Sequence, residues 1–231
     1  MLYKLLKAQR EFLEIPHDYT LDVAVYQGGY GSGKTFSGSL LGILLALKFP
    51  GVRGLVGAQT YTLVRDTTLQ TYFEHLDNFG FIEGKDYEWS SSLQKLSFKN
   101  GSEILFRHFD EPNKLKSLNL GFVEIEEMSD IPYDTLKMLL GRMRQRVKKV
   151  WKEFTYRIFG HTNPEMQRGW VYKTFIENPA PNYRLITAPT TQNIYLPEGF
   201  CNELKKIYDE QYYNIFVLAQ NGEYNNGLVV K

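Results

Sequence analysis

Short apolar runs alternate with amphipathic stretches along this chain, and each pattern predicts one kind of element. Compact runs of aliphatic and aromatic residues, typical of buried strands, lie at residues 22–27, 53–58, 120–125 and 154–159. Stretches with helical spacing of apolar residues predict helices at residues 1–15, 35–49, 67–79, 132–150 and 202–218. Because strands and helices follow one another in this order, we expect an α/β fold with a mostly parallel sheet covered by helices.

A β-hairpin is predicted inside this alternation, where two alternating runs in residues 96–109 flank Asn100 and Gly101. Beyond Pro189 the chain becomes rich in turn residues before the last predicted helix begins. We therefore place a boundary near residue 190, between a core of residues 1–190 and a small C-terminal subdomain of residues 191–231.

Composition limits the classes of protein to which the chain can belong. Hydrophobic residues make up 43% of the sequence and charged residues 23%, as in ordinary globular domains. Lys and Arg (27) nearly balance Asp and Glu (26), so any contact with nucleic acid must come from a local patch. The single cysteine, Cys201, excludes an internal disulfide and is typical of the reducing cytosol. The apolar run at residues 40–49 is too short to span a bilayer, and the four histidines lack zinc-ligand spacing.

The segment GGYGSGKT matches the phosphate-loop pattern G-x-x-x-x-G-K-[ST] in full. We expect all its residues to bind nucleotide: Gly28, Gly29, Tyr30, Gly31, Ser32, Gly33, Lys34 and Thr35. Glycines let successive backbone N–H groups point at phosphate oxygens, and the following helix adds its positive N-terminal end. Lys34 would reach the β- and γ-phosphates, and the Thr35 hydroxyl would bind magnesium. ATP with Mg²⁺ is the predicted ligand, because residues 113–116 lack the Asp of a guanine-reading N-K-x-D segment.

Two adjacent glutamates, Glu126 and Glu127, end the strand predicted at residues 120–125. Successive strand residues point to opposite faces, so we assign Glu126 to the magnesium and Glu127 to the base that polarises an attacking water. The alternative is a solvated strand end with two surface carboxylates. Glu124 does not fit a central parallel strand, which is normally apolar on both faces. Either this strand has one wet face, or Glu124 has a basic partner.

Together these segments resemble the N-terminal ATPase domain of phage large terminase subunits, over nearly the whole chain. LLKAQREFL is similar to the family's Q segment, which implies that Gln9 reads adenine. GGYGSGKT and GFVEIEEMS resemble its Walker A loop and its Walker B strand with the catalytic glutamate. IFGHTNPEMQRGWVY resembles its motif III, which implies that Thr162 and Asn163 link hydrolysis to movement.

The resemblance implies a RecA-like (ASCE) P-loop fold with a small C-terminal lid. It also implies an ATPase that drives double-stranded DNA into a procapsid, a homo-oligomeric ring, a portal and a small terminase subunit as partners, and a place in the host cytoplasm. Two departures stand out. Many terminases carry Arg where this loop has Tyr30, so a positive charge is missing there or is supplied by another residue. The sequence also ends at Lys231, before the family's nuclease domain, so we expect no DNA cleavage from it.

A basic finger from a neighbouring subunit is a further implication of the resemblance. The candidates are Lys116 before the acidic strand and Arg142 or Arg144 after it; guanidinium geometry favours the arginines, and position in the family favours Lys116. Residues 142–152 carry six positive charges, which predict either a contact with DNA or a neighbouring subunit, or a solvated helix end. Two rival functions stay open: another nucleic-acid motor of helicase or recombinase type, and a nucleotide-gated assembly module with little hydrolysis.

Overall fold

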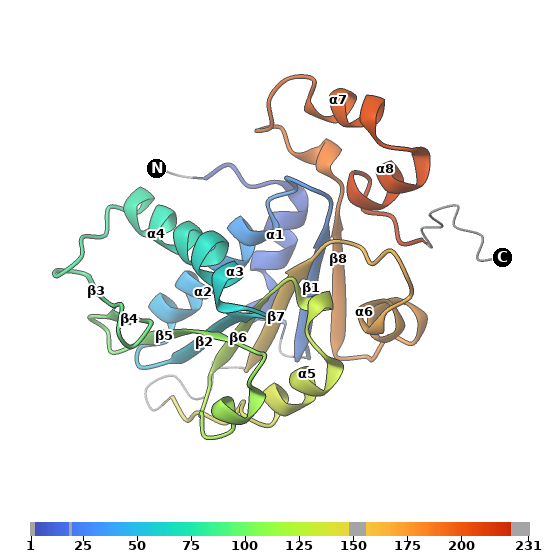
Figure 1. Ribbon diagram of the computed structural model, residues 1–231. Coiled ribbons are helices and arrows are strands. Elements are labelled where there is room, and N and C mark those ends of the chain that lie inside the picture. Colours follow the sequence, from blue (N-terminus) through green and yellow to red (C-terminus); the bar gives the residue numbers. More distant parts are fainter. Residues whose placement is uncertain (1–2, 19, 148–155, 223–231) are drawn as a thin grey trace.

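The computed structural model describes residues 3–18, 20–147 and 156–222, and in this part of the chain eight strands form one sheet (Figure 1). The strands are β1 Val23–Gly28, β2 Arg53–Ala58, β3 Tyr87–Ser90, β4 Lys95–Phe98, β5 Glu103–His108, β6 Phe122–Glu126, β7 Arg157–Thr162 and β8 Tyr183–Ala188. Their order across the sheet is β3-β4-β5-β2-β6-β7-β1-β8. Neighbouring strands from β5 to β8 are parallel, whereas β4 is antiparallel to both β3 and β5. The predicted parallel sheet with an inserted hairpin is confirmed.

Helices cover both faces of this sheet. They are α1 Lys7–Leu13, α2 Lys34–Lys48, α3 Tyr61–Leu63, α4 Leu69–Asn78, α5 Tyr133–Leu140, α6 Trp170–Tyr172, α7 Phe200–Ile207 and α8 Glu210–Phe216. Short 3-10 or π segments lie at Ile15–His17, Val64–Thr68, Pro112–Leu115, Met128–Asp130, Lys173–Glu177 and Thr190–Gln192. In Figure 1, α1 to α4 lie over one face and α5 and α6 over the other, while α7 and α8 lie beyond the carboxyl end of β8. Within the described residues, no helix has the length and apolar character needed to cross a bilayer.

The central strands are apolar on both faces because both faces are covered. Every residue of β1, β6 and β7 is buried. Toward α1 and α2 these strands present large rings, Tyr26, Phe122 and Phe159, each at most 1% exposed. Toward α5 they present aliphatic side chains such as Val123 and Ile158. This two-sided burial is typical of parallel sheets and fixes the level at which each strand ends.

The position of β7 decides which residues meet. It lies between β1 and β6, and its register pairs Thr162 with Gln27 of β1 and His161 with Glu126 of β6. Parallel strands have their carboxyl ends at one edge of the sheet. The residues that follow β1, β7 and β6 therefore come together there, although they lie far apart in the sequence.

Three predicted helices have the wrong extent. In place of the helix predicted at residues 1–15, residues 3–6 are not helical and α1 is followed by a 3-10 turn at Pro16, which has no amide hydrogen to continue the helix; residues 1 and 2 lie outside the described residues. The helix predicted at 132–150 ends at Leu140. Beyond Gly141 the chain runs beside the start of β6, where Leu120 N donates to the Arg142 carbonyl at 3.0 Å. Residues 148–150 of this predicted helix lie outside the described residues, and so do residues 148–152 of the basic run.

The helix predicted at residues 202–218 is two helices, α7 and α8. Asp209 separates them, because its carboxylate accepts a hydrogen bond from Tyr212 N at 2.8 Å and so begins a new helix. The strand predicted at 154–159 is β7, which begins at Arg157; residues 154 and 155 lie outside the described residues. The helix predicted at 67–79 is α4, and helical backbone already begins at α3. The predictions missed β3, β8 and α6.

Gly54 offers a test of how tightly the central sheet is packed. It pairs with Phe122 across β2 and β6, and a Cβ atom at this position would lie 2.1 Å from the Phe122 ring. We expect Gly54→Ala to destabilise the protein by about 1–3 kcal/mol, since the buried ring has little room to move. Gly141→Ala is the matched control, because its Cβ would meet only ordinary contacts. Urea unfolding midpoints measure both changes, and equal midpoints would contradict the expected crowding.

Candidate functional site

The phosphate loop connects β1 to α2 and has the backbone that its glycines allow. Gly31 and Gly33 have φ angles of +70° and +82°, in the left-handed region that favours glycine, and α2 begins at Lys34 directly afterwards. Beneath the loop, the buried Tyr26 hydroxyl donates to the Ser32 carbonyl at 3.1 Å. The loop is therefore a preformed turn at the N-terminus of a 15-residue helix, a geometry suited to anions.

Lys34 turns back over this loop. Its Nζ donates to the carbonyls of Gly28 and Gly29, both at 3.2 Å, and to Asn163 Oδ1 at 2.8 Å. The side chain is 9% exposed, and burial lowers the pKa of its ammonium while Glu127 and Glu126 act to raise it. A buried cation within reach of acceptors on three residues is poised to bind phosphate oxygens.

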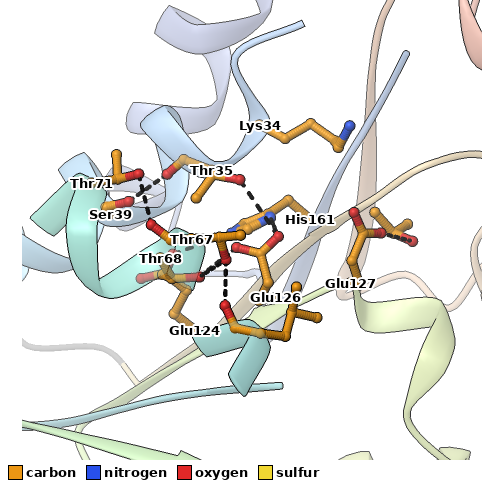
Figure 2. Close-up of polar contacts among 12 residues, drawn as sticks. Lys34, Thr35, Ser39, Thr67, Thr68, Thr71, Glu124, Glu126, Glu127 and His161 are labelled. Atoms are coloured by element: carbon orange, nitrogen blue, oxygen red, sulfur yellow. Dashed lines mark hydrogen bonds and ion pairs between the residues drawn. The ribbon is translucent and has the colours of Figure 1, made fainter. Parts of the chain in front are cut away.

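Glu126 ends β6 beside the start of α2 (Figure 2). Its Oε1 lies 3.5 Å from Thr35 Oγ1, and its Oε2 accepts from Thr68 Oγ1 at 2.5 Å. Burial acts to raise the pKa of this carboxyl, but His161 and Thr68 outweigh it and the pKa is lowered. Glu126 is thus held as a carboxylate facing a hydroxyl, a pair of hard oxygen donors.

Glu127 follows directly and leaves the strand. Its φ of +44° lies in the left-handed region, which is uncommon for a residue with a side chain. Its Oε2 accepts from Thr162 Oγ1 and from Asn163 N, and its Oε1 accepts from Asn163 Nδ2, each at 3.3 Å. Burial raises the pKa of this carboxyl, against the lowering effect of Lys34. The backbone turn therefore directs Glu127 away from Glu126, toward Asn163.

Asn163 joins the two halves of the site. Its side-chain oxygen accepts from Lys34 while its amide nitrogen donates to Glu127, so one side chain connects the phosphate loop with the second glutamate. Thr162 Oγ1 adds a bond of 2.7 Å to Ser129. Of the residues expected from the sequence, the structure thus brings together Lys34, Thr35, Glu126, Glu127, Thr162 and Asn163.

Glu124 has the basic partner that one of the two explanations required. It is fully buried, its Oε2 accepts from the Tyr72 hydroxyl at 2.6 Å, and its Oε1 lies 3.2 Å from His161 Nε2. The wet face is therefore the wrong explanation. Thr68, Tyr72 and His161 were not foreseen, and only the position of His161 beside Thr162 in the sequence could have drawn attention to it.

A separate cavity of about 420 Å³ opens next to the loop and contains Gln9. The residues that line it are Tyr3, Lys4, Gln9, Gly33, Phe36, Asn193 and Tyr195. Gln9 is only 5% exposed, and its Oε1 accepts from Leu6 N at 2.8 Å, which fixes the amide beside Gly33. Three rings, two side-chain amides and a glycine of the phosphate loop make this cavity suitable for a flat heterocycle joined to phosphates.

Tyr30, at the tip of the loop, packs against the C-terminal segment. Its ring stacks on Phe216 of α8, with centroids 5.0 Å apart and planes 6° from parallel, and its hydroxyl bonds to that of Tyr212 at 3.1 Å. Tyr30 N also donates to the Phe216 carbonyl at 2.7 Å. The Tyr30 side chain is therefore a contact with α8.

The three candidates for a basic finger lie at the opposite end of β6. The Arg142 guanidinium donates to the Lys116 carbonyl, and Arg144 Nε donates to Asn119 Oδ1 at 2.6 Å, next to the residues that precede β6. Because β6 itself separates this end from Glu127, none of the three can reach the glutamate of its own chain.

The residues present fit ATP and magnesium. Ser32 Oγ is buried in the loop without a hydrogen-bond partner, and Lys34 donates to backbone carbonyls that phosphate oxygens could replace. Thr35 and Glu126 offer the oxygens that Mg²⁺ prefers, and this ion commonly takes one or two protein ligands together with substrate phosphates. Among the described residues, no group of three or more His, Cys, Asp or Glu side chains could hold a metal by itself.

Comparisons with known proteins agree with this geometry. A family model described as phage terminase large subunit matches residues 21–223. The PBSX phage terminase large subunit of Bacillus subtilis (strain 168) is 31% identical over 226 residues, covering 88% of this chain and 49% of the relative. The chain therefore spans about half the length of that curated relative.

Solved structures give the same result for the fold. The large terminase from a thermophilic bacteriophage, in complex with ADP, superposes with a TM-score of 0.77 at 14% identity, covering 94% of this chain and 53% of that one. The large terminase ATPase domain of Thermus phage P74-26 superposes with a TM-score of 0.66 at 16% identity, covering 95% of each. These matches confirm the expected RecA-like P-loop fold.

The stack between Tyr30 and α8 predicts a local change on mutation. Tyr30→Ala removes an aromatic pair worth about 0.5–1.5 kcal/mol beyond its area, so amide hydrogens of α8 should exchange about two- to tenfold faster. Tyr30→Phe keeps the stack and loses only the bond to Tyr212, so its effect should be smaller. Hydrogen–deuterium exchange followed by mass spectrometry measures both variants, and unchanged exchange of α8 in Tyr30→Ala would contradict the role of the stack.

Proposed function

The chain belongs to the phage terminase large subunit family, and from this premise we propose that it is the ATP-hydrolysing module of a viral DNA-packaging motor. The observation that carries the proposal is the bridge through Asn163, which connects Lys34 with Glu127. A phosphate-binding cation and a buried carboxylate are thereby held on opposite sides of one amide. That spacing suits an attack by water on a terminal phosphate.

Each residue then has a distinct task in hydrolysis. Lys34 and the loop amides bind the β- and γ-phosphates, and Glu127 accepts a proton from the attacking water. Its raised pKa is expected of a base in a buried site. Thr35 and Glu126 would hold Mg²⁺, which supplies charge stabilisation on the phosphate oxygens. Gln9 reads the adenine edge at the cavity that it lines with Phe36.

Thr162 and Asn163 couple the chemistry to movement in this proposal. Both contact Glu127. Thr162 is the last residue of β7 and Asn163 follows it, so a change in the position of Glu127 alters the contacts at the end of that strand. Asn163 shares the Lys34 ammonium with the phosphates, since the ammonium has three N–H donors and phosphate oxygens can replace the carbonyls of Gly28 and Gly29. The strand can in this way respond to the presence of the γ-phosphate.

For the whole motor we propose the partners that the family implies. Several copies form a ring, double-stranded DNA passes through it into a procapsid, and a portal and a small terminase subunit bind to it in the host cytoplasm. We divide the chain near residue 190 into an ATPase core and a lid, and we expect no DNA cleavage from these 231 residues.

A basic side chain from a neighbouring copy completes the site. A second cavity of about 420 Å³ opens beside Glu127, lined in part by Asp130, Asn163 and Glu165. Its carboxylates would attract a cation from outside the chain. Lys116, Arg142 and Arg144 are the candidates, and all three lie too far from their own Glu127 to act there.

Replacing Glu127 by Gln tests the proposed chemistry. We expect kcat for phosphate release from ATP to fall by about 10²–10⁴-fold, because the amide cannot accept the proton. ATP affinity should stay close to that of the wild type, since Glu127 does not contact the phosphate loop except through Asn163. Phosphate release is measured with Mg²⁺ over a range of protein concentrations, with and without duplex DNA, and Lys34→Ala serves as the variant that loses binding.

The outcomes separate the candidate functions. Activity that rises with protein concentration and with duplex DNA supports a packaging ring. Stimulation by single-stranded DNA far above duplex would favour a helicase-like motor instead. Tight ATP binding without any turnover, at every concentration and with DNA present, would point to a nucleotide-gated assembly module.

A mixing experiment tests the finger. Lys34→Ala subunits bind no nucleotide but keep all three basic candidates, whereas a subunit with Arg142→Ala and Arg144→Ala keeps its own nucleotide site. If an arginine acts between subunits, each variant alone should be inactive and an equal mixture should recover a large part of the turnover, because fingers contribute about 10³–10⁵ in rate. The same mixture with Lys116→Ala in place of the arginine variant shows whether Lys116 or the arginine pair acts. Wild-type turnover by both the double arginine variant and Lys116→Ala would exclude all three candidates.

A further inference from the structure

His161 lies between two glutamates in the interior, one strand away from the phosphate loop. It belongs to β7, is fully buried, and faces Glu124 and Glu126 of β6. Nε2 lies 3.2 Å from Glu124 Oε1, and Nδ1 lies 3.4 Å from Glu126 Oε1. The two glutamates are two residues apart in β6 and therefore share one face of the sheet. Figure 2 shows the imidazole beside both carboxylates and below Thr35.

The imidazole faces one carboxylate with each of its two nitrogens. Nδ1 has no hydrogen bond, and the Glu126 carboxylate lies 3.4 Å from it. Buried polar groups without such neighbours would be costly at this depth.

Helix α2 closes the cluster from above. A Cβ atom at Gly38 would lie 2.4 Å from Glu124 Oε1 and 2.6 Å from His161 Cδ2, and one at Gly42 would lie 1.8 Å from the Tyr72 hydroxyl. Only glycines at these two positions, one turn apart on one face of the helix, let it approach so closely. The helix that begins with Lys34 and Thr35 therefore rests directly on the buried charges.

The two oxygens of Glu126 are held differently. Oε2 accepts the short bond from Thr68, whereas Oε1 faces both Thr35 Oγ1 at 3.5 Å and His161 Nδ1 at 3.4 Å. The oxygen that faces Thr35 is thus the one that His161 orients. Glu124 in turn fixes His161 from its other nitrogen.

From this arrangement, and on the basis of the proposed function, we infer that His161 is a positioning residue for magnesium: its Nδ1 contact holds Glu126 Oε1 toward Thr35, and Glu124 holds His161. His161 does not touch the metal or the nucleotide in this role. It also precedes Thr162 and Asn163 directly, so the strand that carries the coupling residues is tied to the carboxylate of the metal site.

Three variants separate positioning from stability. His161→Gln leaves two buried carboxylates without a cation, Glu124→Gln keeps an acceptor for His161, and the double variant removes one charge of each sign and so limits the cost in stability. The readout is the affinity for a fluorescent ATP analogue with and without Mg²⁺, and urea unfolding checks the fold of each protein. We expect the gain in affinity from Mg²⁺ to fall about tenfold or more in His161→Gln and in the double variant, as for other partners of metal ligands. Glu124→Gln should stay close to the wild type.

The results distinguish this inference from the proposed function. If Mg²⁺ gives the wild type no gain in nucleotide affinity, the proposed metal site itself is wrong. If the wild type shows the gain and a folded double variant keeps it, the role of His161 is wrong. If the variants do not fold, a measurement on the wild type still tests the inference. In histidine-labelled wild type, the His161 imidazole signals should shift when Mg²⁺ is added to the nucleotide complex, and unchanged signals would overturn the inference.

Discussion

Lys34 Nζ donates to Asn163 Oδ1 at 2.8 Å, and this hydrogen bond joins the phosphate loop to the residues around Glu127. It exists because β7 lies between β1 and β6, so the residue after β7 stands midway between the loop and the acidic strand end. The bond is charge-assisted and partly buried, which makes it stronger than a bond between neutral groups in water. A shift of any of the three strand ends would change the distance between the ammonium and Glu127, and the geometry of the whole site with it.

The same edge of the sheet concentrates charge, and its arrangement explains an otherwise misplaced residue. Glu124 would be unfavourable in a central parallel strand by itself. Here it pairs with His161, which also faces Glu126. Glu124, Glu126 and the His161 imidazole therefore share a compartment beneath α2. Glu127 avoids this compartment because its left-handed backbone turns it away. The three glutamates thus have two environments although they lie within four residues.

Much of the site could be predicted because its signals are local. The residues of the loop from Gly28 to Thr35 are contiguous in sequence, and so are the two glutamates at the end of β6. The strand–loop–helix pattern around each group indicates where it lies in the fold. His161, Thr68 and Tyr72 could not be found in this way, since their partners are set by the order of the strands and by the packing of α4 on α2. The helix predicted to Val150 failed for a related reason. Basic residues after Leu140 fit a helix by pattern, but backbone bonds to Leu120 hold the chain extended beside β6.

The C-terminal segment forms hydrogen bonds with the phosphate loop, and these contacts bear on the source of a cation besides Lys34 at the site. Thr190 Oγ1 donates to the Tyr30 carbonyl at 2.8 Å and Asn193 Nδ2 to the Gly31 carbonyl at 2.6 Å, while the Tyr30 ring stacks on Phe216. The loop tip therefore carries an aromatic contact with the C-terminal segment. Arg142 and Arg144 lie at the far end of β6, so Lys34 and His161 are the cations that the described residues place near the glutamates. His161 is already balanced by Glu124 and Glu126, so in the proposed motor a further positive charge on the phosphates would come from a neighbouring copy.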